Sequence, residues 1–187
     1  MINNYKCLTK QVYTLGDFSL IPIRSEDRFK IMEWRNSQIY HLRQETPLTS
    51  DDQNRYFSEI VEKLFTLSRP TQILFSYVKR NVCIGYGGLV HIDWNNLNAE
   101  LSFIMDTQLE NNEFNIHWNN FLKMIQQVAF EILNLRKIFT YAFDLRPKLY
   151  NVLEENDFIR EALLKEHVFF DGKFINVIIH SKINNGN

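Results

Sequence analysis

The chain has 187 residues, 45% of them hydrophobic, and its 21 lysines and arginines nearly balance 22 aspartates and glutamates. This length predicts one domain with a buried core over residues 1–187, and a net charge of −1 without blocks of like charge argues against a nucleic-acid partner. Cys7 and Cys83 stand far apart without metal-ligand spacing, so we expect two reduced thiols and no metal site. The sequence shows neither a basic and apolar leader nor an apolar run of membrane-spanning length, and we expect a cytoplasmic protein without a membrane partner.

The first third of the sequence predicts one strand and two helices. Residues 18–23 have the character of a strand, and residues 1–16 before them are expected to form an extension. Ser25 is a suitable N-cap for a helix over residues 26–36, and Ser50-Asp-Asp-Gln53 has the pattern of a capping box for a second helix. The apolar residues of the second helix recur at spacings of three and four and predict one buried stripe: Tyr56, Phe57, Ile60, Val61, Leu64 and Phe65.

The middle third predicts three strands and a long helix. Residues 72–79, 82–92 and 99–105 read as strands joined by short turns, which requires an antiparallel sheet. A polar stretch at residues 106–115 is expected as a connecting loop. The long helix that follows has an apolar face made of Trp118, Phe121, Leu122, Ile125, Val128, Ala129, Ile132 and Leu133.

The last third predicts a strand, a short helix and a closing hairpin. Residues 137–143 form the strand, and Pro147 suits the first turn of the helix. Asp171 and Gly172 separate two apolar, β-prone runs, which is the strongest local signal for a hairpin because both turn residues must tolerate positive φ. Residues 183–187 are expected to be a frayed tail.

This order of strands and helices predicts an α+β domain. This order and the amino-acid sequence of residues 154–182 together resemble the GNAT superfamily of acetyl-CoA-dependent N-acetyltransferases, in the branch that acetylates ribosomal-protein N-termini and amino-sugar nucleotides. Trp34-Arg35-Asn36 is similar to the Trp-Arg-Asn of acetyltransferases that act on amino-sugar nucleotides. The resemblance implies a GNAT-like mixed, mostly antiparallel central sheet of about seven strands with helices on both faces.

The resemblance also implies a function, the transfer of acetyl from acetyl-CoA, a cosubstrate, to a primary amine by direct attack. We expect a small-molecule acceptor such as an amino-sugar nucleotide, and a monomer or homodimer. Two alternatives stay open: a GNAT-fold protein that is non-catalytic or binds the coenzyme weakly, and an N-terminal acetyltransferase of proteins.

Such a reaction needs a base for the amine proton and an acid for the leaving thiolate. By resemblance, Glu100 is the expected base, His91 a possible proton relay, and Tyr150 the nearest phenol that could protonate the thiolate. Asp93, at the end of the same strand as His91, is expected beside the acceptor. The structural alternatives are a solvated strand-edge carboxylate for Glu100 and a satisfied structural histidine for His91.

Other residues are expected to line the acceptor entrance. Arg35 and Arg43 would border it, because an arginine fork suits a diphosphate or a carboxylate. Asn36 and Tyr86 are assigned to the same site by resemblance, although Tyr86 could also be a core residue. The glycines of residues 85–88 either leave room under the acceptor or mark a bulge that bends the sheet.

The segment expected to hold the coenzyme pyrophosphate departs from the family pattern. Relatives carry a glycine turn there, but residues 107–118 contain no glycine, and Phe114 and Ile116 stand at the two glycine positions. Glu110 and Glu113 add negative charge beside a negative ligand, whereas asparagines could adopt the left-handed conformations of a phosphate nest. The residues expected at the coenzyme, the first three through their backbone, are Phe103, Ile104, Met105, Asn111, Asn112, Asn115 and Arg146.

Overall fold

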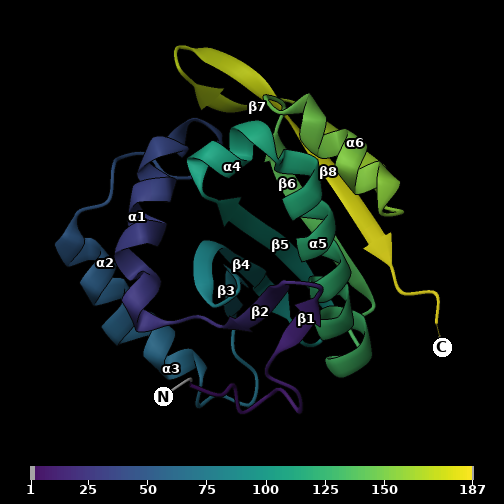
Figure 1. Ribbon diagram of the computed structural model, residues 1–187. Coiled ribbons are helices and arrows are strands. Elements are labelled where there is room, and N and C mark those ends of the chain that lie inside the picture. Colours follow the sequence, from purple (N-terminus) through teal and green to yellow (C-terminus); the bar gives the residue numbers. More distant parts are fainter. Residues whose placement is uncertain (1–2, 187) are drawn as a thin grey trace.

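The protein, a computed structural model that describes residues 3–186, is built around one eight-stranded sheet (Figure 1). Its strands are β1 (Tyr13–Leu15), β2 (Phe18–Pro22), β3 (Ile73–Lys79), β4 (Val82–Asp93), β5 (Asn98–Met105), β6 (Lys137–Phe143), β7 (Ile159–Phe170) and β8 (Lys173–Ile183). They lie in the order β1-β2-β3-β4-β5-β6-β8-β7, and only β5 and β6 pair in parallel. The predicted mixed, mostly antiparallel α+β fold is confirmed, with one strand more than expected.

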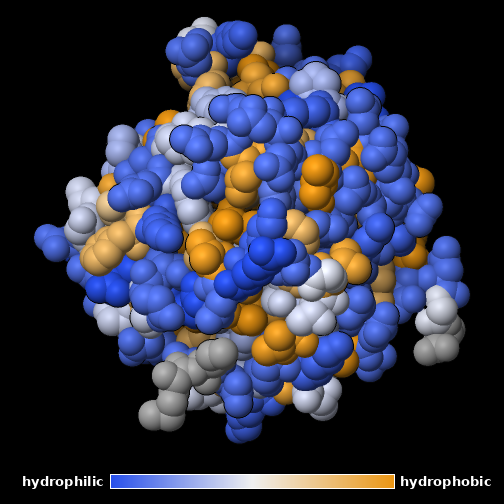
Figure 2. Space-filling view, in the orientation of Figure 1, coloured by the Kyte–Doolittle hydropathy of each residue, from blue (hydrophilic) through white to orange (hydrophobic). Residues whose placement is uncertain are grey.

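The helices cover both faces of the sheet, as predicted. They are α1 (Arg28–Ser37), α2 (Ser50–Tyr56), α3 (Glu62–Leu64), α4 (Thr107–Asn112), α5 (Phe114–Gln126) and α6 (Pro147–Glu155), with π turns at Phe57–Val61 and Gln127–Ile132. On one face, Arg35 of α1 donates a hydrogen bond to the hydroxyl of Tyr86 in β4. On the other face, the ring of Phe103 in β5 stacks on Phe121 of α5, with centroids 4.1 Å apart. Figure 2 shows hydrophobic residues gathered in the middle of one side, over the sheet between α1 and α5.

The two turn dipeptides behave as the sequence predicts. Arg80 and Asn81 have φ of 46° and 73°, and Asp171 and Gly172 have φ of 48° and 75°. Positive φ at both central residues matches the right-handed twist of a hairpin. The β7–β8 hairpin projects from the body at the top of Figure 1.

The segment predicted as an N-terminal extension belongs to the sheet and its core. Residues 13–15 form β1, and the fully buried Tyr13 packs edge-on against Phe75. The Tyr5 hydroxyl donates to the carbonyl of Leu74 at 2.8 Å and accepts from the amide of the same residue at 2.9 Å. Residues 1, 2 and 187, part of the predicted extension and tail, lie outside the described residues.

Three local predictions in the first helices are wrong. Ser25 does not cap α1; it begins a short 3-10 turn, and α1 follows Asp27 without a side-chain cap. The capping box lies one residue earlier than predicted, because Thr49 is extended and bonds Asp52 reciprocally. Ile60 is 43% exposed rather than buried, because the π turn at Phe57–Val61 breaks the spacing of three and four.

The predicted polar loop at residues 106–115 is also wrong, because most of it is helical. Asp106 accepts a hydrogen bond from the amide of Gln108 and thereby caps α4. Glu113 separates α4 from α5 with φ of −128° and ψ of 24°. In the part of the chain that the structure describes, no helix has the length and apolarity that crossing a membrane would require.

Candidate active site

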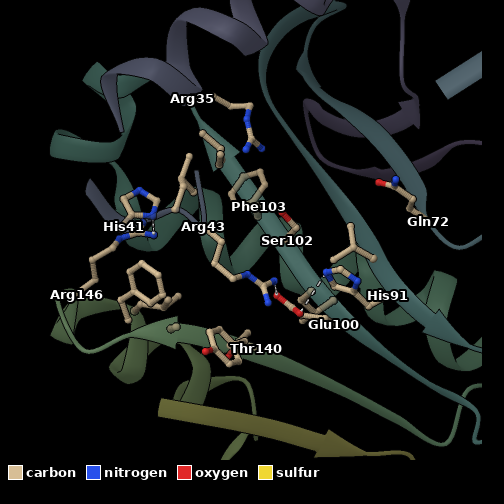
Figure 3. Close-up of a pocket in the computed structure, with 18 of the residues that line it drawn as sticks. Arg35, His41, Arg43, Gln72, His91, Glu100, Ser102, Phe103, Thr140 and Arg146 are labelled. Atoms are coloured by element: carbon tan, nitrogen blue, oxygen red, sulfur yellow. Dashed lines mark hydrogen bonds and ion pairs between the residues drawn. The ribbon is translucent and has the colours of Figure 1, made fainter. Parts of the chain in front are cut away.

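The sheet opens between its two parallel strands. β5 and β6 are paired only at Asn98–Lys137, Ala99–Ile138 and Glu100–Phe139. Beyond these pairs, residues 101–104 and 140–143 diverge and line opposite walls of a cleft of about 530 Å³ (Figure 3). The backbone groups of residues 101–104 that face β6 therefore lack a strand partner, as the predicted backbone contacts of Phe103 and Ile104 to an acyl group require.

An ion pair crosses the middle of the cleft. Figure 3 shows Arg43 and Glu100 pointing toward each other, and the Arg43 guanidinium donates to the Glu100 carboxylate. The Glu100 side chain is only 8% exposed, whereas that of Arg43 is 46% exposed. The Arg43 guanidinium also lies 4.7 Å from the centre of the Tyr141 ring. A carboxylate and an aromatic face therefore hold one cation at the fork.

The structure brings His91 and Glu100 together. The His91 Nε2 atom lies 3.9 Å from a Glu100 carboxylate oxygen, which one water molecule could bridge. A bulge between Val90 and Asp93 produces this approach, since it places His91 at φ of 50° on the cleft wall. The Asp93 carboxylate instead accepts three hydrogen bonds from Asn95 and Asn96, which lower its pKa and hold the turn into β5.

Arg35, predicted to border the acceptor entrance, lines the cleft and has neutral partners only. Its guanidinium donates to the Tyr86 hydroxyl at 2.6 Å and to the Gln44 side chain at 2.9 Å. Within residues 3–186, it makes no contact with a carboxylate short enough for an ion pair. Asn36, expected beside it, bonds the backbone of Leu48 with both ends of its amide and so fixes the segment after α1.

A second ion pair, almost fully buried, lies at the other end of the cleft. Arg146 Nη2 donates to the Glu110 carboxylate at 2.6 Å, and the side chains are 8% and 4% exposed. Arg146 Nη1 faces Nδ1 of His41 at 3.2 Å. Burial, followed by the charge of Arg146, lowers the pKa of His41 to about 3, so this imidazole is neutral and its Nδ1 accepts a hydrogen bond from the guanidinium.

Three buried polar atoms on the cleft wall point to a ligand. Among the described residues, Trp118 Nε1, Thr140 Oγ1 and Arg146 Nε are buried and lack a protein hydrogen-bond partner. Buried polar groups of native proteins are nearly always satisfied. An extended ligand with amide and phosphate acceptors fits these donors, and the pantetheine arm and diphosphate of acetyl-CoA supply such acceptors.

Other expected residues lie elsewhere. The Tyr150 hydroxyl donates to Asp144 and its ring stacks on His180, outside the residues that line the cleft. Burial raises the pKa of Tyr150. The three asparagines are helical, Asn111 and Asn112 in α4 and Asn115 in α5, so the expected left-handed nest does not form.

The third predicted backbone contact, that of Met105, does not lie in the cleft. The Met105 carbonyl instead accepts a hydrogen bond at 2.7 Å from Gln38, the residue that follows α1.

Several residues that line the cleft are not predicted as site residues, among them His41, Trp118, Thr140 and Tyr141. Trp118 is predicted only as a core residue, and Thr140 and Tyr141 only as part of a strand. Alternation along 137–143 could have indicated that two adjacent strand residues face different sides. Nothing in the sequence around His41 signals its contact with Arg146, since 105 residues separate the two.

Two parallel strands that part inside a cleft, with a buried carboxylate at the fork and unpaired backbone beyond it, define a domain that binds an extended acyl donor. The chain belongs to the acetyltransferase (GNAT) domain family, whose model matches residues 20–179. It is accordingly an N-acetyltransferase with acetyl-CoA as acyl donor. The ribosomal-protein or amino-sugar-nucleotide branch stays a prediction.

Solved structures share this fold at low sequence identity. Spermidine N-acetyltransferase from Vibrio cholerae, in complex with CoA and spermine, is 21% identical with a TM-score of 0.74, over 90% of this chain and 96% of that chain. A putative acetyltransferase is 13% identical with a TM-score of 0.69, over 93% of this chain and 87% of that chain. These similarities establish the fold alone, and no curated protein matches the sequence.

Proposed function

We propose that this protein transfers acetyl from acetyl-CoA to the primary amine of a small molecule that also carries an anionic group, such as an amino-sugar nucleotide. The observation that carries the proposal is the balance of charge in the cleft. Arg43 is paired with Glu100 and Arg146 with Glu110, but Arg35 has only neutral partners. A half-buried guanidinium without a counter-charge is a site for a carboxylate or a phosphate.

The same geometry supports a direct transfer. The acceptor nitrogen attacks the thioester carbonyl carbon, and Glu100 takes the amine proton, directly or through a water molecule held by His91. Backbone N–H groups of residues 101–104 that face the fork donate to the oxygen that becomes negative. The carbon–sulfur bond then breaks, coenzyme A leaves as a thiolate, and solvent in the cleft returns to it the proton that Glu100 took from the amine.

A polyamine is the second candidate acceptor. The structurally similar protein from Vibrio cholerae is a spermidine N-acetyltransferase. In this chain, Glu100 and the ring of Tyr141 already hold the cationic group of Arg43, and an ammonium group could replace it there.

The experiment is a thiol-release assay with acetyl-CoA and three acceptors: an amino-sugar nucleotide, spermidine and a peptide with a free N-terminus. We expect the nucleotide to be the preferred acceptor, and Arg35→Gln to raise its KM about tenfold or more, since a hydrogen-bonded ionic contact contributes about 1.5–3 kcal/mol. Preference for spermidine or the peptide, with KM unchanged in Arg35→Gln, would overturn the anionic acceptor. No thiol release with any amine, and no rise of the melting temperature with millimolar acetyl-CoA, would favour a non-catalytic protein of this fold.

A further inference from the structure

We propose that the Glu110 carboxylate occupies, in the free protein, the site that the diphosphate of the coenzyme takes on binding. Arg146 and Lys148 form this anion site with the first turn of α5, in place of a glycine turn. The inference rests on acetyl-CoA being the donor, and it concerns how this chain binds the coenzyme without the glycines.

Arg146 is the centre of the site. Its side chain is 8% exposed and lines the cleft, so its charge is removed from bulk water yet borders the space for a ligand. Nη2 is bound to Glu110 and Nη1 to His41, while Nε has no partner among the described residues. Among the described residues, Glu110 is the only carboxylate bound to this guanidinium, and the neutral His41 adds no charge. The free N–H leaves one more position for an acceptor oxygen.

Lys148 adds a second cation to the same carboxylate. Its Nζ atom lies 3.5 Å from a Glu110 carboxylate oxygen and donates to the Glu110 carbonyl at 2.9 Å. The ammonium group also lies 4.3 Å from the centre of the Phe114 ring, and the Arg146 guanidinium lies 5.3 Å from the same centre. The two cations therefore flank the first residue of α5.

The N-terminus of α5 is open to an anion. The residue before it, Glu113, makes no side-chain cap, and the first amides of a helix have no acceptor within the helix. These amides and the helix dipole add positive potential beside the two cations. Two cations thus converge on one carboxylate next to the first residue of α5, and the local balance of charge favours a ligand with two negative charges over the single charge of Glu110.

Glu110 can leave this site without disturbing the core helix. It lies on α4, a six-residue helix that the backbone break at Glu113 separates from α5. A diphosphate offers more acceptor oxygens than a carboxylate and can engage the fork of Arg146 in two bonds. Coenzyme binding is therefore an exchange of anions, and the displacement of Glu110 lowers the apparent affinity.

The test measures binding of CoA and of inorganic pyrophosphate by calorimetry, with no acceptor and no turnover. We expect Glu110→Gln to bind CoA about tenfold more tightly than the unaltered protein, since the competing anion is gone. We expect Lys148→Ala, which leaves the Glu110–Arg146 pair in place, to bind both probes about tenfold more weakly. The matched control is Glu161→Gln, whose carboxylate pairs with Lys137 at 2.6 Å outside the residues that line the cleft, and we expect its affinity to stay within about threefold.

The results separate this inference from the function itself. If Glu110→Gln is folded but binds CoA no more tightly than Glu161→Gln does, Glu110 is not a substitute for the diphosphate. If Glu110→Gln fails to fold, the test rests on Lys148→Ala. An affinity of Lys148→Ala for CoA and pyrophosphate equal to that of the unaltered protein would refute the anion site. Strong CoA binding that is equal in all variants would refute only this inference, whereas absence of CoA binding in every variant would refute acetyl-CoA as donor.

Discussion

Replacing Glu100 with glutamine tests the chemistry of the fork with little change in shape. The substitution removes the charge that Arg43 binds, but the Arg43 side chain is 46% exposed and can turn to solvent. An ion pair with one exposed partner contributes at most about 1 kcal/mol, so the melting temperature should fall by only a few degrees, roughly 2–4 °C. If Glu100 accepts the amine proton, kcat should fall by about 10²–10⁴, because that is the usual contribution of a general base.

The assay is thiol release at saturating acetyl-CoA, with thermal unfolding followed by circular dichroism on the same samples. A fall of 10²–10⁴ corresponds to about 3–5 kcal/mol in the barrier, several times the expected loss of stability. The control is Asp17→Asn, which removes the carboxylate of an exposed ion pair with Arg80, 2.8 Å long and outside the cleft. It should change neither kcat nor the melting temperature appreciably.

A different result would refute the role given to Glu100. If Glu100→Gln kept kcat within about threefold of the unaltered protein at an unchanged melting temperature, water or another residue would take the proton. Glu100 would then serve only to hold Arg43.

Three further predictions concern stability. Because the unfolded chain protonates His41 near its ordinary pKa of about 6.5 and the folded chain only near 3, stability should fall by about 2 kcal/mol between pH 7 and pH 5, and His41→Gln should lose less over that range in urea titrations. Gly87→Ala should lower the free energy of unfolding by about 1–3 kcal/mol, since its Cβ would collide with the carbonyl of Ser102 on β5. Tyr5→Phe should cost about 1–3 kcal/mol, because it leaves the buried amide of Leu74 without a partner, while the carbonyl of Leu74 keeps its hydrogen bond from Ile23.

Each of these has an outcome that contradicts it. Equal pH dependence in His41→Gln and in the unaltered protein would place the titration at the other buried histidines, His117 and His180, whose pKa values burial also lowers. A Gly87→Ala protein as stable as its parent would mean that β5 can shift. For Tyr5→Phe, the control is Tyr40→Phe on an exposed ring, and equal melting temperatures of the two variants would show that residues before β1 add nothing to stability.

Except for β1, the strands of this fold and the turns of its hairpins follow from local sequence. Residues 80–81 and 171–172 tolerate positive φ, and strand β6 has the predicted bounds 137–143 because its residues are β-prone and flanked by turns. The glycines of β4 also have a local explanation. A Cβ on Gly87 or Gly88 would meet the backbone of a neighbouring strand, so these residues permit close strand approach rather than leaving room under the acceptor.

The predictions that fail depend on contacts that are distant in sequence or on backbone geometry. The π turn in the second helix moves Ile60 to the surface, although its spacing fits a buried stripe. Residues 107–112 look like a polar loop because their composition is polar. They are helical because Asp106 caps them and because Glu110, the residue that faces inward, finds its counter-charge at Arg146, 36 positions away. Polar composition is therefore a poor predictor of a loop where one of the polar residues forms a buried ion pair.

The three arginines of the cleft lead to one conclusion about specificity. They differ in their partners. Arg43 binds a carboxylate at the fork, Arg35 binds two neutral oxygens, and Arg146 binds a carboxylate and an imidazole. Arg146 exchanges its carboxylate for the coenzyme, and Arg43 can yield its carboxylate to the reacting amine. Of these three arginines, Arg35 alone has no carboxylate partner. An anionic acceptor can therefore bind it without displacing a carboxylate of the protein. For that reason Arg35→Gln should change KM and leave kcat nearly unaltered, whereas Glu100→Gln should do the reverse.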